Sequence, residues 1–297
     1  MKQIRKIIMA NLINIFILIK CNEGMNNGNE NMDKCNKSME DLTKELENKD
    51  KTLFAENKVK DVFLSVDRGD FIDSKETRDS NKCNDIYEDK PKNIGHNATI
   101  SAPYMHAKVL ELVYSALKDK INKEKQNKEE QNKKELKCLD IGSGTGILSL
   151  LLKRLLGPNS EVIGIEHIKD LVDKSIENIE KATDNPTKTG VENPNDKDTI
   201  QILEEDGLNF KTDEKFDCIH IGAAVNDGEY EKWKNLLKEG GILVFPKKKD
   251  NEEKLTKITK NLGSESYEEK ELIPVRYVPL TKKENQLNSN NKKPIII

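Results

Sequence analysis

Acidic residues follow three successive apolar runs in the middle of this chain, and the first of them opens a glycine-rich turn. Asp140 begins the segment DIGSGTG, Glu166 ends the next apolar run, and Asp206 ends the run after that. Glycines in such a turn let the backbone bend sharply and approach a ligand closely. The turn alone is a weak signal, because it also serves nicotinamide dinucleotides or simply a tight connection.

The charge at these three positions narrows the choice of ligand. A carboxylate at Asp140 would repel a pyrophosphate but suits a cationic sulfonium and an ammonium group. Glu166 lies about 20 residues beyond the last glycine, where an acid can hold both ribose hydroxyls. Asp206, followed by Gly207, falls where an adenine amino group can donate. Each acid alone is equally well explained as a turn cap, but three acids at three successive run ends favour S-adenosyl-L-methionine as the cofactor.

The residues around these acids alternate between short apolar runs and helical patterns. Strands are expected over 136–141, 161–166, 200–206, 216–222 and 241–246. Helices are expected over 145–156, from Ile168 to Ile179, and between the last two strands, ending at Gly240–Gly241. Such alternation predicts a parallel sheet covered on both faces, with ligands at the carboxyl ends of the strands. The expected fold class is therefore α/β, a doubly wound and mostly parallel sheet.

Further elements are expected on either side of this pattern. Residues 39–66 and 104–118 read as helices that precede the sheet, with Val59, Val62 and Phe63 on one face of the first region. Residues 253–260 and 270–280 read as a closing pair of strands, linked by a turn near Gly263. The sheet is thus expected to carry N-terminal helices and an antiparallel end.

Segments rich in Asn, Lys and Glu divide the chain. Those at 119–135 and 182–198 bury too little apolar surface to offset the cost of ordering them, so both are expected to be surface insertions. For the first, an extended solvated helix is the alternative. We expect a single domain over 38–297, preceded by a disordered tail or signal-like segment over 1–37.

The composition limits the partners. A net charge of -3 gives no reason to expect nucleic acid or stable membrane association, and we expect a monomer. The five cysteines form no CxxC pair and have no zinc-like spacing, so no metal is expected. Their odd number favours a reducing compartment and a cytoplasmic location. Residues 1–24 have basic residues before an apolar run, which leaves a secretory route as the alternative.

Several segments together resemble the protein-L-isoaspartate O-methyltransferase family, which belongs to the class I S-adenosylmethionine-dependent methyltransferases with a Rossmann-like fold. The motifs are IGHNATISAP with ATISAPYMH at 98–106, DIGSGTGIL, IGIEHIKDLV, HIGAA at 220–224, LKEGG at 237–241 and RYVPLT at 276–281. DIGSGTG is shared by many methyltransferases, whereas ATISAPxMH combined with YVPLT is specific to this family. The resemblance runs from about residue 39 to about residue 286.

The resemblance implies a role for each matching residue. The cofactor-binding set comprises Ala98, Thr99, Ile100, Ser101, His106, Asp140, Gly142, Ser143, Gly144, Glu166, His167, Asp206, Gly207, Thr281 and Gln286. The substrate-binding set comprises Ser101, His106, Tyr277 and Val278, and Ser101 supplies the catalytic hydroxyl. The implied activity is transfer of a methyl group to the free carboxylate of isoaspartyl residues in damaged proteins and peptides.

Two departures from the family pattern bear on the site. Glu166 stands where family members often carry Asp, and its longer side chain still reaches a ribose. Lys247, Lys248 and Lys249 replace the glycine-rich loop that usually follows the fifth strand. These lysines put the edge of the peptide site in doubt and raise the alternative of a preference for acidic peptides.

The implied chemistry needs orientation rather than a base. An isoaspartyl carboxylate is ionised at neutral pH and can attack the methyl group directly, so one hydroxyl, from Ser101, is enough to orient it. The alternatives remain open: Ser101 could cap the following helix, His106 could be an ordinary buried histidine, and His220 reads as structural. A methyltransferase for another acceptor, or a non-enzymatic homologue that binds the cofactor, would fit the same fold.

Overall fold

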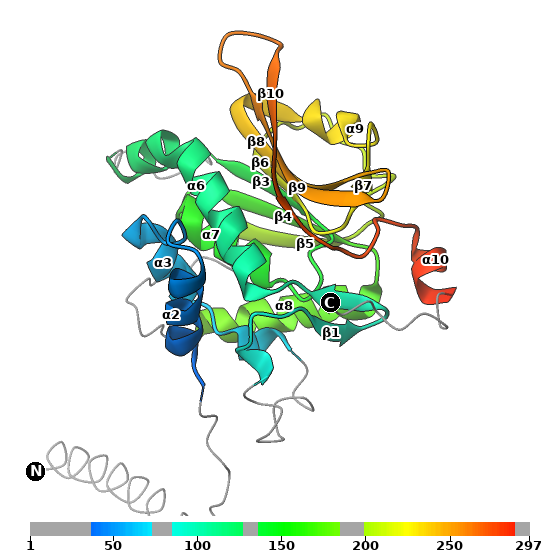
Figure 1. Ribbon diagram of the computed structural model, residues 1–297. Coiled ribbons are helices and arrows are strands. Elements are labelled where there is room, and N and C mark those ends of the chain that lie inside the picture. The colour runs from blue at the N-terminus through cyan, green and yellow to red at the C-terminus, as the bar shows by residue number, and fades with distance from the viewer. Residues whose placement is uncertain (1–36, 73–84, 127–135, 185–198, 289–297) are drawn as a thin grey trace, which may run out of the picture. The chain divides into compact units, whose positions relative to one another are not determined.

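A seven-strand path forms the centre of the molecule in the computed structural model, which describes residues 37–72, 85–126, 136–184 and 199–288 (Figure 1). The expected tail, except Lys37, and the parts of the expected insertions over 127–135 and 185–198 lie outside the described residues. The strands are β3 (Lys137–Ile141), β4 (Glu161–Glu166), β5 (Ile200–Glu204), β6 (Phe216–Ile221), β8 (Leu237–Lys249), β9 (Glu252–Lys260) and β10 (Tyr267–Pro274).

The order of the strands is that of a doubly wound sheet with an antiparallel end. The path runs β10-β9-β8-β6-β3-β4-β5, and the short β7 (Val225–Asn226) pairs with β8. Strands β5, β4, β3, β6 and β8 are parallel, whereas β9 and β10 pair antiparallel. The carboxyl ends of the parallel strands therefore meet at one edge, as the predicted α/β class requires.

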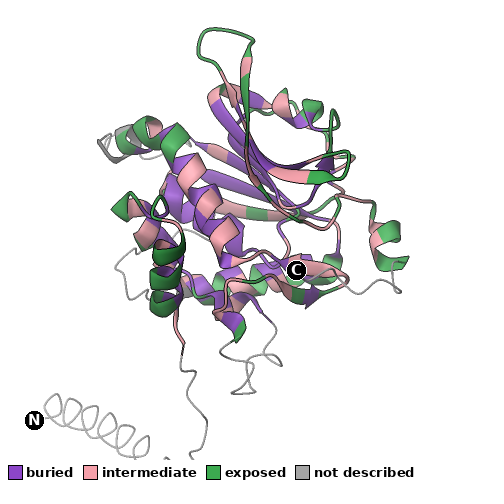
Figure 2. Ribbon diagram, viewed as in Figure 1, coloured by how far each residue is buried: buried purple, intermediate pink, exposed green. Residues whose placement is uncertain are grey.

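Alternate residues of the strands fill two separate apolar layers, because successive side chains point to opposite faces of a sheet. Cys138 and Cys218 lie in the layer beneath the helices on one face, and Leu139 and Ile219 lie in the layer on the other face. All four side chains are buried, which explains why these strands read as continuous apolar runs. Among the central strands, β4 and β6 are buried along their whole length (Figure 2). Cys138 and Cys218 are thus small buried residues of the core.

Helices cover the two faces unequally (Figure 1). One face carries α2 (Met39–Lys49), α3 (Asn57–Leu64), α6 (Pro103–Gln126), α7 (Ile147–Leu156) and α8 (Lys169–Asp184). The other face carries α9 (Glu231–Lys234), whose Trp233 is 1% exposed. Within the described ranges, no helix combines the length and the apolar character needed to cross a membrane.

The first helical region is divided by a turn that the apolar pattern does not reveal. Helix α2 begins at a capping box formed by Ser38 and Asp41, and Asp50 is its C-cap. The carboxylate of Asp50 accepts hydrogen bonds from the backbone N–H and the hydroxyl of Thr52, at 2.9 and 2.6 Å. Phe54 then adopts a positive φ of 58°. This turn folds α3 back, so residues 39–66 form two helices.

The expected helix before Gly240–Gly241 is wrong in its extent. Only the single turn of α9 forms, and β8 begins at Leu237, which pairs with Phe216. Gly240 has a φ of 66°, and a Cβ on Gly241 would lie 3.0 Å from the carbonyl oxygen of Phe216. The two glycines therefore permit a bulged strand to approach its neighbour closely, instead of ending a helix.

Two small elements lie beyond the main sheet. Strands β1 (Lys92–Gly95) and β2 (Ala98–Ile100) form a hairpin whose turn residues His96 and Asn97 have φ values of 53° and 57°. Helix α10 (Lys283–Asn288) follows the extended segment after β10. The amide nitrogen of Asn97 donates to the carbonyl oxygen of Gln286 at 2.9 Å, so the hairpin and α10 are in direct contact.

Helix α6 includes the first part of the segment that was expected to be an insertion, as the helical alternative allowed. Ile121 is 2% exposed and belongs to the core, and the ammonium group of Lys120 contacts Asp217 on β6 at 2.9 Å. The polar composition of 119–135 conceals these two contacts. Residues 119–121 therefore belong to the domain and are not a surface insertion.

Replacing Ile121 with alanine tests this assignment. We expect Ile121→Ala to lower the free energy of unfolding by about 2–4 kcal/mol, because the change leaves a cavity in the core. Asn122→Ala, at the neighbouring exposed position, is the matched control and should change it by about 0.5 kcal/mol or less. Equal effects of the two variants in urea unfolding would contradict the placement of Ile121.

Candidate active site

A small cavity lies where β2 meets α6 and where β3 and β6 end. It measures about 40 Å³. The predicted residues that line it are Thr99, Ile100, Ser101, His106, Asp140, Gly142, Ser143 and Gly144. Its wall also includes His220 and Gly222, which follow each other closely at the end of β6. Residues far apart in the sequence are thus brought together at the predicted edge of the sheet.

Asp140 is buried at the base of this cavity and is held from two sides. Asp140 and His220 are directly paired in the register of β3 and β6, and Oδ1 of Asp140 lies 2.8 Å from Nδ1 of His220. The hydroxyl of Ser149, on α7, donates to Oδ2 at 2.6 Å. Asp140 is 1% exposed, so these two contacts compensate much of the cost of burying its charge.

The glycine-rich turn brings bare backbone to the cavity. Gly142 and Gly144 have φ values of 76° and 57°, which glycine adopts without a steric penalty. The backbone N–H groups of Gly142 and Ser143 both donate to the carbonyl oxygen of Ile165, at 2.8 and 3.1 Å. A Cβ on Gly222 would lie 3.0 Å from the carbonyl oxygen of Gly142. Both sides of this gap therefore favour glycine.

Two hydroxyl groups in the wall of the cavity fit a polar ligand. The side-chain oxygens of Ser143 and Thr145 are buried, and neither has a hydrogen-bond partner among the described residues. Buried polar atoms normally have partners. The hydroxyls and the glycine cradle match the polar amino-acid end of S-adenosyl-L-methionine. The 40 Å³ cavity is much smaller than a typical ligand pocket, so the rest of the cofactor must occupy the adjoining strand ends.

Glu166 and Asp206 lie at those strand ends, and each also stabilises its own turn. The carboxylate of Glu166 accepts from the N–H groups of Ile168 and Gly144, at 3.0 and 3.2 Å. Burial raises the pKa of Glu166. The carboxylate of Asp206 accepts from the N–H of Leu208 at 2.9 Å and from the side chain of Asn209. Glu166 and Asp206 thus both cap their own turns, and their carboxylate oxygens can still accept further hydrogen bonds.

Glycine is also required beside Asp206. A Cβ on Gly207 would lie 2.4 Å from the Cγ2 atom of Ile141, at the end of β3. Gly207 therefore lies directly against the strand that leads into the glycine-rich turn.

The C-terminal helix reaches the same edge of the sheet. The side-chain oxygen of Gln286 lies 2.7 Å from Nε2 of His167, which follows β4, and its side-chain nitrogen donates to the carbonyl oxygen of His96. Gln286 thus links α10 to β4 and to the β1–β2 hairpin. Thr281 lies half-buried in the segment that leads into α10, and Ala98 opens β2 and packs against the core.

Ser101 is fixed by two neighbours and does not cap α6. The guanidinium of buried Arg68 donates to the carbonyl oxygen of Ser101 at 2.8 Å, and the side chain of Tyr277 lies close to that of Ser101. The N–H of Tyr104 in the first turn of α6 donates instead to the carboxylate of Asp89, at 2.9 Å. The helix-cap alternative for Ser101 therefore loses its geometric basis.

Arg68 is a site residue whose role the sequence did not reveal. It is 1% exposed, and its three donating nitrogens reach the carbonyl oxygens of Ile86, Lys90 and Ser101. A planar guanidinium suits such a fixed set of acceptors. The contact ties the segment that contains Ser101 to the loop before β1.

The segment that contains Tyr277 and Val278 is held by its backbone. The N–H of Tyr277 donates to Glu253 at 2.8 Å, and the carbonyl oxygen of Val278 accepts from the N–H of Ala224 at 2.8 Å. Burial raises the pKa of Tyr277 to about 12. This segment thus runs alongside the residues that follow β6, close to Ser101.

Lys247 is held internally, so it cannot bind acidic peptides in this arrangement. Its ammonium group lies 2.6 Å from Glu269 and 3.3 Å from Asp227. Burial disfavours its charge, but the hydrogen bonds to these two carboxylates outweigh burial and raise the pKa of Lys247. Tyr230 donates to Glu269 at 2.9 Å in the same cluster. Lys247, the first of the lysines that replace the family loop, thus belongs to a structural ion-pair cluster.

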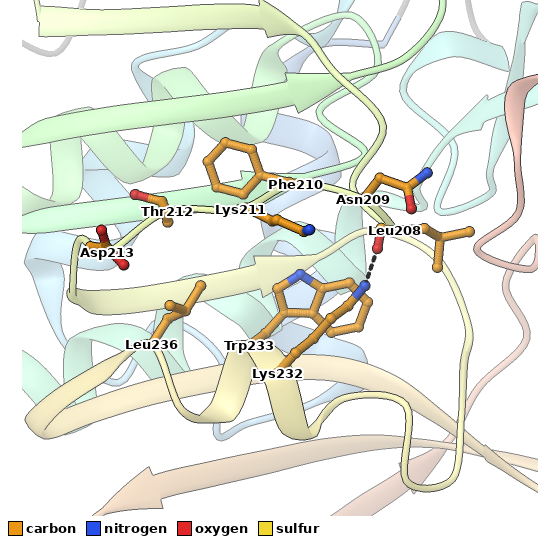
Figure 3. Close-up of a pocket in the computed structure, with 9 residues that line it drawn as sticks. All are labelled: Leu208, Asn209, Phe210, Lys211, Thr212, Asp213, Lys232, Trp233 and Leu236. Atoms are coloured by element: carbon orange, nitrogen blue, oxygen red, sulfur yellow. Dashed lines mark hydrogen bonds between the residues drawn. The ribbon is translucent and has the colours of Figure 1, made fainter.

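A larger cavity, of about 460 Å³, lies elsewhere, between residues 208–213 and α9 (Figure 3). Lys232 donates to the carbonyl oxygen of Leu208 and lies 4.1 Å from the centre of the Trp233 ring. The described residues that line this cavity include none of the predicted site residues. Size therefore does not identify the functional site here. Among the described residues, no cluster of His, Cys, Asp and Glu is suited to a metal ion.

The doubly wound sheet, the glycine-rich turn and the acids at successive strand ends define a class I S-adenosylmethionine-dependent methyltransferase. The family model for protein-L-isoaspartate(D-aspartate) O-methyltransferase matches residues 37–285. The chain belongs to this protein-L-isoaspartate O-methyltransferase family.

Individual relatives agree with the assignment. The chain is 38% identical over 225 residues to a probable protein-L-isoaspartate O-methyltransferase of Dictyostelium discoideum, with 75% of this chain and 63% of the relative covered. It is 33% identical to the Caenorhabditis elegans enzyme, with 82% and 92% covered. A Plasmodium falciparum structure, described as a putative protein-L-isoaspartate O-methyltransferase in complex with S-adenosyl-L-homocysteine, matches with a TM-score of 0.60 and 28% identity, covering 82% of this chain and 99% of that chain.

The buried imidazole of His106 generates a pH prediction. Burial and the charge of Arg68 hold the pKa of His106 well below its usual range, so the folded chain keeps this ring neutral. Below a pH of about 6.5, the unfolded chain binds a proton on the imidazole of His106, and the folded chain does not. Stability is therefore lost as the pH falls.

Replacing His106 with glutamine should reduce this acid sensitivity. Between pH 6.5 and 5, roughly, the free energy of unfolding should fall less steeply in His106→Gln than in the wild-type chain, by up to about 1.4 kcal/mol per pH unit. Urea unfolding at several pH values measures both slopes. Identical slopes would mean that His106 takes up its proton equally in both states.

Proposed function

We propose that this chain transfers a methyl group from S-adenosyl-L-methionine to the free carboxylate of L-isoaspartyl residues in damaged proteins and peptides. The position of Ser101 carries the proposal: it lines the cavity beside the glycine-rich turn, with Tyr277 on its side chain and Arg68 on its carbonyl. The matched family model and the relatives point to the same acceptor.

The residues around the cavity suit a reaction that needs no base. When bound, the cofactor supplies an electrophilic methyl group on a cationic sulfur. The substrate carboxylate is already ionised near neutral pH, and Ser101 can donate one hydrogen bond to orient it. Burial and neighbouring charge keep His106 neutral. It therefore does not act as a cation that would draw the substrate carboxylate away from Ser101.

The product accounts for repair without a further enzymatic step. A methyl ester is a better leaving group than a carboxylate, so the neighbouring backbone nitrogen can displace methanol and close a succinimide. Hydrolysis of the succinimide returns some normal aspartate. Methylation of D-aspartyl residues, a monomeric state and a cytoplasmic location remain predictions within this proposal.

The test is a methyl-transfer assay with an isoaspartyl peptide and its aspartyl twin. The two peptides have the same composition and charge and differ only in which carboxyl group continues the chain. We expect a methyl ester, which then releases methanol, to form on the isoaspartyl peptide and not on its aspartyl twin. Equal methylation of both peptides, or methylation at a nitrogen, would contradict the proposed acceptor. It would favour a methyltransferase of the same fold that acts on another acceptor.

Loss of the Ser101 hydroxyl should slow turnover. Ser101→Ala removes a charge-assisted hydrogen bond of about 1.5–3 kcal/mol, which corresponds to a fall of about tenfold to a hundredfold in single-turnover rate. Cofactor affinity should change much less, because the hydroxyl acts on the substrate.

Asp89→Ala is the matched control for a capping effect. It removes the carboxylate that accepts from Tyr104 in the first turn of α6. We expect a loss of about 1 kcal/mol in stability and an unchanged rate per folded molecule. A full rate for Ser101→Ala would remove the hydroxyl from the mechanism.

A further inference from the structure

The carboxylate expected to meet the cofactor is already held by two side chains. Asp140 is 1% exposed, and its two oxygens are held by His220 and Ser149, at 2.8 and 2.6 Å. It is therefore poorly placed to contact a ligand directly. His220 lines the same cavity, so its ring faces the ligand space beside this carboxylate.

The contact with Asp140 determines which edge of His220 is available. An ionised carboxylate only accepts hydrogen bonds, so Nδ1 of His220 must be the donor at 2.8 Å. In the neutral ring, Nε2 then keeps its lone pair and is an acceptor. Among the described residues, the hydrogen bonds of the ring involve Nδ1 alone.

The neighbouring backbone restricts where a ligand can meet this ring. A Cβ on Gly222 would lie 3.4 Å from Cε1 of His220 and 3.0 Å from the carbonyl oxygen of Gly142. The ring, the two glycines and the buried hydroxyls of Ser143 and Thr145 thus surround one polar region beside the glycine-rich turn. A cationic hydrogen-bond donor fits this region, because the Asp140–His220 pair carries one negative charge.

We propose that His220, oriented by Asp140, is a cofactor-binding residue whose Nε2 accepts a hydrogen bond from the α-ammonium group of S-adenosyl-L-methionine. The sulfonium carries no hydrogen to donate, and the ribose hydroxyls belong to the strand ends near Glu166. The ammonium is the cationic donor at the amino-acid end of the cofactor. The inference rests on the cofactor part of the proposed function.

Three ligands and one substitution separate this contact from others. S-Adenosyl-L-homocysteine carries the ammonium, its desamino analogue lacks only that group, and 5′-methylthioadenosine lacks the whole amino-acid part. His220→Asn places an amide nitrogen near the position of Nδ1, so the donor to Asp140 is kept while Nε2 is lost. Titration calorimetry gives a dissociation constant for each pair and needs no turnover.

We expect His220→Asn to weaken S-adenosyl-L-homocysteine by about tenfold to a hundredfold, the effect of one charge-assisted hydrogen bond. For the desamino analogue, the dissociation constants of the wild-type chain and of His220→Asn should agree within about twofold. The same should hold for 5′-methylthioadenosine. Unchanged binding of 5′-methylthioadenosine also shows that the variant is folded.

Ser149→Ala is the matched control, because it removes the other hydrogen bond to Asp140 and leaves Nε2 in place. It should keep the wild-type ratio of affinities for S-adenosyl-L-homocysteine and its desamino analogue. His220→Gln, which returns an acceptor oxygen at the end of the side chain, should keep more of that ratio than His220→Asn.

Several outcomes would overturn the inference alone: an equal loss for both ligands in His220→Asn, no loss for either, a ratio that collapses in Ser149→Ala, or no advantage of glutamine over asparagine. If His220→Asn binds none of the ligands, the glutamine comparison decides. Failure of the wild-type chain to bind S-adenosyl-L-homocysteine would overturn the proposed function together with this inference.

Discussion

The buried carboxylate of Asp140 is the constraint on which the site depends. It joins β3 to β6 through His220 and joins the sheet to α7 through Ser149, all in a region from which water is largely excluded. A charge so placed is strongly unfavourable without partners. Satisfying it fixes the register of the two central strands, the first turn of α7 and the ring orientation of His220. The glycine-rich turn between β3 and α7 is held in place as a consequence.

A second buried charge organises the segment that contains Ser101, the proposed acceptor side. Arg68 draws three carbonyl oxygens from two segments toward one guanidinium: Ile86 and Lys90 lie in the loop before β1, and Ser101 lies in the other segment. Tyr277 approaches Ser101 from the C-terminal segment, which the backbone of Ala224 holds. The cofactor side and the acceptor side are thus built on different buried charges, and they meet at the cavity. This division fits a methyl transfer in which alignment, not proton removal, is the task of the protein.

The sequence predicted the sheet well, because the central strands are buried on both faces and their apolar runs are bounded by acids and glycines. It also predicted most of the residues around the cavity, which come from ATISAP, a motif specific to the family, and from DIGSGTG, a turn that many methyltransferases share. It misplaced the helix before Gly240–Gly241, since glycine pairs at a bulge and at a helix end look alike. The roles of Arg68 and His220 depend on contacts across the chain. Aligning CLD at 138–140 with CIH at 218–220 as neighbouring parallel strands would have paired Asp140 with His220.

Nitrogen NMR of histidine-labelled protein tests the role of Asp140 most directly. The chain has only four histidines, and the His220→Asn variant assigns the signals of His220 by their absence. Because a carboxylate must accept from Nδ1, the ring of His220 should carry its proton on Nδ1, with an unprotonated Nε2. The Nε2 signal should move when S-adenosyl-L-homocysteine is added and stay in place with 5′-methylthioadenosine. A proton on Nε2, or an Nε2 signal that both ligands leave unchanged, would contradict the arrangement in which Asp140 acts on the cofactor through His220.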